Sequence, residues 1–211
     1  MPIPKEKENE KFNYKLYQTW PEGERWELIE GEAFDMSPAP NTNHQRLSMK
    51  ISGEIYNFLK DKPCELFPAP FDVRLSEMEN SEEQDIETVV QPDIVVICDN
   101  NKIDKKGCLG APDLVIEILS PQDAWASSEL ANDQPSTGYK DETSKLALYE
   151  KHGVKEYWIV NPEAEYIMIY HLEGKKYSKP DYLRKEDILE SLVLKGLNIN
   201  LQDIFPKSLQ N

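Results

Sequence analysis

The sequence of 211 residues predicts a single α/β domain. Residues 92–98 and 112–119 are short apolar runs rich in β-branched side chains, which is typical of buried strands. Residues 44–59 repeat an apolar side chain every three or four positions, which is the period of an amphipathic helix. Strands mixed with substantial helices in a chain of this length favour one α/β domain with one core.

The remaining elements are predicted in chain order. Residues 1–12 are charged and aperiodic, so we expect a flexible N-terminal tail before a single domain over residues 13–211. Strands or hairpins are predicted at residues 25–34, 71–75, 154–160 and 166–170, the last paired with residues 176–177 in a C-terminal hairpin. Loops are predicted at residues 77–87 and 99–111, and a polar insertion at about 122–140. A second helix is predicted at residues 141–152, where Gly153 would end it.

Charge and hydropathy limit the classes of function. Basic residues number 24 against 39 acidic ones, a net charge of −15, so the surface as a whole is not expected to attract nucleic acid. Acidic residues around a metal ion can still belong to a phosphodiester-cleaving site, because the ion supplies positive charge. No apolar run reaches the roughly 20 residues of a membrane helix, and the first residues lack the apolar stretch of a signal peptide. We therefore expect a cytoplasmic protein without a membrane partner.

The cysteines, the histidines and the absent glycine-rich motifs argue against a disulfide framework, a zinc site and a small-molecule enzyme. Cys64, Cys98 and Cys108 are odd in number and lack CxxC spacing, so we expect neither a disulfide framework nor a thiolate zinc site. The three histidines lack the HExxH pattern of a zinc enzyme. The sequence also lacks a GxGxxG loop, a Walker-type loop and a GxSxG elbow, which disfavours a small-molecule α/β enzyme.

An acidic residue inside an apolar strand indicates a site. Glu117 interrupts the apolar residues 114–119. Burial of an unpaired carboxylate there would cost on the order of several kcal/mol, so a metal, a basic partner or water must accept the charge.

The pairing of the two apolar strands suggests a partner for this acid. If they form an antiparallel hairpin, Cys98 lies near Pro112 and Asp93 lies beside Glu117. Directly opposed residues have Cβ atoms about 4.5–5.5 Å apart, so two carboxylates could share one divalent ion. Asp113 would lie roughly 13 Å from Glu117 at about 3.3 Å per residue, and we interpret it as a strand-entry residue.

A cation is expected near the two acids. Asp141, Lys145 and Tyr149 follow one another at helical i, i+4 spacing and share one face. This pattern fits a surface Asp–Lys pair worth about 0.2–0.5 kcal/mol beside a partly buried tyrosine. It equally fits a Lys145 that points into the site, where an ammonium could orient water or stabilise a pentacovalent phosphate.

The ordered motifs resemble one known family. They are residues 27–32 (ELIEGE), 91–93 (QPD), 111–121 (APDLVIEILSP), 145–149 (KLALY) and 153–162 (GVKEYWIVNP). The set is similar to the Uma-two family of the PD-(D/E)XK restriction-endonuclease-like superfamily, over about residues 26–170. The resemblance implies a restriction-endonuclease-like core with a mixed central sheet flanked by helices.

The resemblance also implies a site. Asp93 would be the acid of the PD motif and Glu117 the acid of the (D/E)XK motif, and both would bind Mg²⁺, with Mn²⁺ as a substitute. Leu119 stands where the plain superfamily pattern has a lysine. In this family the lysine comes from the following helix, which maps to Lys145.

Three further residues have open roles. Glu27 and Glu30 are either auxiliary acids, with Glu27 preferred as a catalytic residue, or solvent-facing charges of a strand. His44, at the start of the long helix, is either a capping or surface residue or faces the site.

The function implied is a Mg²⁺-dependent endonuclease that hydrolyses phosphodiester bonds of DNA. By analogy we expect a homodimer, because cutting both strands of a duplex favours two active sites. The alternative is a catalytically weak or inactive module of the same fold that binds nucleic acid or a protein partner. Leu119 and the net charge of −15 favour this alternative.

Overall fold

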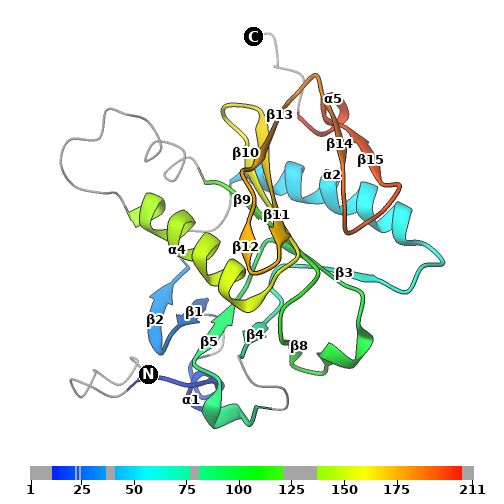
Figure 1. Cartoon of the computed structure of the whole chain (residues 1–211). Helices are drawn as coiled ribbons and strands as arrows, with labels where there is room; N and C mark the ends of the chain where they lie inside the picture. The colour runs from blue at the N-terminus through cyan, green and yellow to red at the C-terminus, as the bar shows by residue number, and fades with distance from the viewer. Residues whose placement is uncertain are drawn as a thin grey trace.

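The computed structural model describes residues 11–21, 23, 25–36, 41–76, 81–120 and 137–205, and for residues 137–143 the backbone alone. In this part of the chain the strands form two larger sheets and one two-stranded ribbon (Figure 1). The combination of mixed sheets with helices confirms the predicted α/β class.

The central sheet has the strand order β12-β11-β10-β9-β6-β3, with β13 paired to β11. The bounds of its strands are β3 Glu65–Pro68, β6 Ile94–Ile97, β9 Leu114–Ile118, β10 Glu156–Asn161, β11 Tyr166–Glu173, β12 Lys176–Tyr177 and β13 Asp181–Arg184. β9 and β10 run parallel, whereas the other neighbours are antiparallel. The mixed central sheet is therefore confirmed, and β11 and β12 form the predicted hairpin.

The second sheet has the order β2-β1-β5-β4-β8-β7. Its strands are β1 Trp26–Ile29, β2 Glu32–Asp35, β4 Val73–Leu75, β5 Thr88–Val90, β7 Ile103–Asp104 and β8 Gly107–Leu109. β1 and β2 form an antiparallel hairpin, which decides between the hairpin and the bent strand expected there. Glu30 and Gly31 make its turn, both with positive φ.

The helices lie outside the sheets (Figure 1). They are α1 Tyr14–Tyr17, α2 Thr42–Leu59, α4 Thr137–His152 and α5 Leu201–Ile204, with short 3-10 turns η1 Glu83–Asp85 and η2 Asn100–Lys102. α2 agrees with the predicted long helix, and the side chain of Asn41 caps it by accepting a hydrogen bond from His44 N. No helix in the described ranges is both long and apolar enough to span a membrane.

The central sheet separates two apolar clusters. One face packs against α2, where Leu47, Ile51 and Ile55 contact residues such as Ile94 and Ile116. The other face packs against α4 and the second sheet, through a cluster that includes Val95, Val115, Leu148, Tyr149 and Val73. Because neighbouring strand residues point to opposite faces, even-numbered residues of β6 and β9 face α2 and odd-numbered ones face α4.

Several elements differ from the prediction. α4 begins at Thr137 rather than at residue 141, so the last part of the expected insertion is helical, while residues 121–136 lie outside the described residues. Of the tail expected at residues 1–12, residues 1–10 lie outside them too, but Phe12 belongs to the fold because its N donates a hydrogen bond to Gly31 O. The β11–β12 hairpin is also not the last element, because β13, the ribbon of β14 Ile188–Glu190 with β15 Asn198–Asn200, and α5 follow.

The predicted loop at residues 99–111 is wrong in its centre. It contains β7 and β8, and β8 pairs in parallel with β4. Gly107, at φ 121°, makes this possible, because a Cβ there would collide with the backbone oxygen of Asp72.

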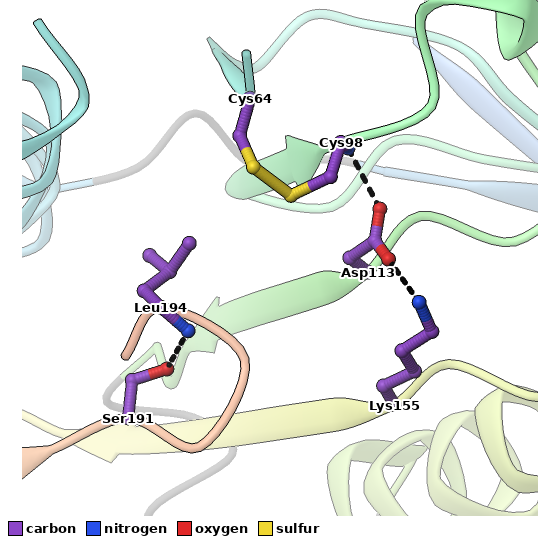
Figure 2. The surroundings of a disulfide bond; sticks show 6 residues. All are labelled: Cys64, Cys98, Asp113, Lys155, Ser191 and Leu194. Carbon is purple, nitrogen blue, oxygen red and sulfur yellow. Dashed lines mark hydrogen bonds and ion pairs between the residues drawn. A yellow bond between two sulfur atoms is a disulfide. The ribbon is translucent and has the colours of Figure 1, made fainter. Parts of the chain in front are cut away.

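Two cysteines form a disulfide that the sequence did not lead us to expect (Figure 2). β3 and β6 are antiparallel with Glu65 opposite Ile97, and this register brings Cys64 beside Cys98. The odd number of cysteines and the lack of CxxC spacing do not reveal this pair. The two cysteines are 34 residues apart and meet only because their strands pair. Cys108 is free and buried.

Asp113 lies at the same end of the sheet as the disulfide (Figure 2). One carboxylate oxygen accepts a hydrogen bond from Cys98 N at 2.7 Å, and the other lies 2.6 Å from Lys155 Nζ. These contacts agree with its interpretation as a strand-entry residue.

The disulfide yields a stability prediction. Replacement of Cys64 and Cys98 together by Ala should lower the free energy of unfolding by about 2–4 kcal/mol, because the bond restricts the unfolded chain. Denaturant unfolding with and without reductant measures this, and the reduced wild-type protein serves as the matched control. Three free thiols by mass spectrometry, with no effect of reductant on unfolding, would contradict the bond.

Candidate active site

Two acids predicted from the sequence face each other at one end of the central sheet. β6 and β9 are antiparallel with Ile94 opposite Ile116. The same register places Asp93, one residue before Ile94, opposite Glu117, one residue after Ile116. The strand pairing inferred from the sequence is therefore confirmed.

The two acids also share a face of the sheet. Asp93 is two residues before Val95, and Glu117 is two residues after Val115. Both valines belong to the cluster on the α4 face. The side-chain period of 2 assigns both acids to that face, although Asp93 directly precedes β6 and also reaches His44 of α2.

Asp93 is held by two groups. Its Oδ2 accepts a hydrogen bond from Ile118 N at 2.7 Å and lies 3.0 Å from His44 Nε2. His44 lies in the first turn of α2 and is buried, so the structure decides its open role in favour of a place beside the acids. Burial lowers the pKa of His44, but the hydrogen bond and the charge of Asp93 outweigh burial and raise the pKa above its ordinary value.

Glu117 is bonded from α4. Lys145 Nζ lies 3.1 Å from Glu117 Oε1, and Tyr149 OH donates a hydrogen bond to the same oxygen at 2.8 Å. Of the two interpretations of the Lys145 face, the structure therefore favours the one that points into the site. The side chain of Asp141 lies outside the described ones.

Glu27, from β1, completes this group. It lies 3.2 Å from Lys145 Nζ, so the ammonium lies between two carboxylates. The side chains of Lys145, Glu27 and Glu117 are 9%, 5% and 13% exposed, which makes this a largely buried ionic cluster. Glu27 is therefore not the solvent-facing strand charge that was its other interpretation.

The cluster changes the acidity of Glu117. Burial raises its pKa to about 7, with the charges of Asp93 and Glu27 acting in the same direction and that of Lys145 opposing them. Burial thus outweighs the stabilisation of the carboxylate by the ammonium of Lys145.

The structure does not bring every candidate to the site. Glu30 is exposed in the β1–β2 turn and pairs with Lys151 at 3.0 Å. Asp113 lies at the opposite end of β9. Sequence reasoning missed Gln91, whose backbone N donates a hydrogen bond to Glu27 Oε1 at 2.9 Å. Its place directly before the Pro-Asp motif was the available signal.

The carboxylate pair has a donor set suited to a hard cation. Hydrogen bonds from the described residues reach Oδ2 of Asp93 and Oε1 of Glu117, which leaves Oδ1 and Oε2 for a ligand. Within the described ranges, no group of three His, Cys, Asp or Glu side chains is arranged to hold a metal. Mg²⁺, however, commonly takes one or two carboxylates and keeps several waters, so the two acids fit it.

Glu117 generates a pH prediction for the metal-free protein. Its folded pKa of about 7 exceeds the ordinary 4.5, so the folded state binds more protons between these values. Stability should therefore fall as pH rises from about 4.5 through 7, by roughly 2–3 kcal/mol, and Glu117→Gln should remove this part of the fall. Denaturant unfolding in EDTA at several pH values measures the difference between the two proteins.

The exposed Glu30→Gln provides a matched control and should keep the wild-type profile above pH 6. Parallel pH profiles for wild type and Glu117→Gln would contradict the assigned environment of Glu117.

Comparisons with known proteins agree with this fold. A crystal structure described as a "putative nuclease belonging to DUF820" from Anabaena variabilis ATCC 29413 matches with a TM-score of 0.68, over 92% of this chain and 97% of that chain. At 19% sequence identity, this match shows a shared fold. No curated protein matches the chain. The model of the Uma2 family, described as "Putative restriction endonuclease", matches residues 14–202, and the chain therefore belongs to that family.

Proposed function

We propose that this protein is an endonuclease that hydrolyses phosphodiester bonds of DNA with the help of Mg²⁺ or Mn²⁺. One observation carries the proposal: Asp93 lies opposite Glu117, and the Lys145 ammonium lies 3.1 Å from Glu117. Membership of a family described as restriction endonucleases and the nuclease named in the matching structure support the same chemistry.

Asp93 and Glu117 are the proposed cation ligands. A divalent cation held there would offset phosphate charge and lower the pKa of a bound water. The hydrogen bonds to Asp93 Oδ2 and Glu117 Oε1 fix the orientation of both carboxylates before any ligand arrives. Such prior orientation lowers the entropy cost of binding.

Lys145 is the proposed catalytic cation of the protein itself. Its contacts with Glu27 and Glu117 hold the amine in a fixed orientation in a buried setting. The ammonium can donate a hydrogen bond to the attacking water or to a phosphate oxygen as negative charge develops. Leu119, where the superfamily pattern has lysine, is buried, so Lys145 from α4 supplies the amine instead.

The alternative is a catalytically weak or inactive module that binds nucleic acid or a protein partner. The net charge of −15 favours it, because backbone phosphates are attracted by clustered cations. A homodimer and a cytoplasmic location stay predictions, and the disulfide is more typical of oxidising compartments.

Cleavage of plasmid DNA tests the proposal. Wild-type protein should cut with Mg²⁺ or Mn²⁺, and Glu117→Gln should abolish cutting because one ligand loses its charge. Lys145→Met should lower the rate by about 10²–10³-fold.

Glu30→Gln, the same chemical change at an exposed acid, is the matched control and should cut like wild type. Wild-type protein that binds DNA but does not cut with either ion would favour the inactive module. Glu117→Gln that cuts at the wild-type rate would contradict the assigned site.

His44 allows a second test, because it acts through Asp93 as a positioning residue. His44→Ala should weaken Mn²⁺ binding by about 10–100-fold, the usual effect of losing a hydrogen bond to a ligand. His44→Gln, which keeps an N–H donor, should recover part of the affinity. Direct titration of Mn²⁺ by calorimetry measures both.

Gln45→Ala, at the exposed neighbour in the same helix, should bind Mn²⁺ like wild type. Unchanged Mn²⁺ affinity in His44→Ala would show that this contact does not position a ligand.

A further inference from the structure

Among the residues that the structure describes, no acidic side chain pairs with the guanidinium of Arg25. Its guanidinium contacts one described residue, Gln91: one terminal nitrogen of Arg25 donates a hydrogen bond to Gln91 Oε1 at 3.5 Å. Its Nε is buried and, within the described ranges, has no hydrogen-bond partner. By contrast, Arg74 lies 2.7 Å from Asp104, and Lys145 lies between two carboxylates. An incompletely paired, partly buried guanidinium is costly unless an anion joins it.

Arg25 lies beside the candidate active site. Met36 N donates a hydrogen bond to Arg25 O at 3.0 Å, which extends the β1–β2 ladder by one residue. Arg25 and Glu27 are therefore two residues apart on one strand face, roughly 7 Å from Cα to Cα.

Gln91 links the two side chains. Its backbone N bonds Glu27 Oε1, and its side-chain oxygen meets Arg25. The amide of Gln91 is itself fixed, because its Nε2 donates a hydrogen bond to Asp72 Oδ1 at 2.8 Å. The guanidinium thus rests on a side chain held in place, next to the acid that contacts Lys145.

We propose that Arg25 binds a backbone phosphate of the nucleic acid, beside the phosphate that is cut. This inference rests on the proposed function. A guanidinium offers several N–H donors in a planar fork that matches phosphate oxygens. In a chain with a net charge of −15, affinity for a polyanion must come from such local cations. The contact positions the strand without selecting a base sequence, because phosphates carry no base information.

The salt dependence of DNA binding tests this contact. Affinity for a labelled DNA duplex is measured by fluorescence anisotropy in EDTA, where no cation supports cutting, at several salt concentrations between about 50 and 200 mM. Each neutralised phosphate contributes about 0.9 to the slope of log K against log salt, so Arg25→Gln should reduce that slope by about 0.9. A side chain with a purely structural role would not change the slope.

Two further variants complete the experiment. Arg25→Lys should recover the slope, because it keeps the charge, while binding more weakly than wild type. Lys175→Gln removes the same charge in the exposed turn between β11 and β12, at the opposite end of the central sheet, and should leave the slope unchanged. Circular dichroism verifies that each variant is folded.

The outcomes separate this inference from the proposed function. DNA binding by wild type with an equal slope for Arg25→Gln, or a slope lost in Arg25→Lys as well, would overturn the role of Arg25 alone. Wild-type protein that binds no DNA and cuts none with Mg²⁺ or Mn²⁺ would overturn both.

Discussion

The antiparallel pairing of β6 with β9 is the constraint on which the candidate site depends. Its register places Asp93 opposite Glu117 at the end of the central sheet. A slip of one residue would turn one acid to the face covered by α2, into the apolar cluster that includes Leu47, Ile94 and Ile116. The apolar residues that fill both faces of these strands therefore also specify the geometry of the two carboxylates.

A second constraint is the balance of charge around Lys145. One ammonium lies between Glu27 and Glu117, with Asp93 close enough to raise the pKa of Glu117. Ionic clusters with so little exposure contribute little net stability, because desolvation offsets much of the attraction. The proposed function gives this cluster a role, because an oriented amine beside the carboxylates would serve a cation and a phosphate bound together.

Patterns in the sequence predict the parts of this structure that depend on local period. The helix α2 follows from apolar residues at helical spacing. The pairing of Asp93 with Glu117 follows from the two apolar strands when residues are matched outward from the segment that connects them. β3 and the disulfide were missed because a four-residue strand next to prolines has no clear period, and Cys64 meets Cys98 only through its pairing. Helical spacing predicts which residues share a face of α4 with Lys145. It does not predict which strands that face contacts, because this depends on how α4 packs against β9 and β1.

The most direct test of the paired acids is a crystal structure of the protein with Mn²⁺, which anomalous scattering identifies. We expect one anomalous peak within coordination distance of both Asp93 and Glu117. Carboxylate oxygens that diverge, with the ion bound elsewhere or by one acid alone, would contradict it.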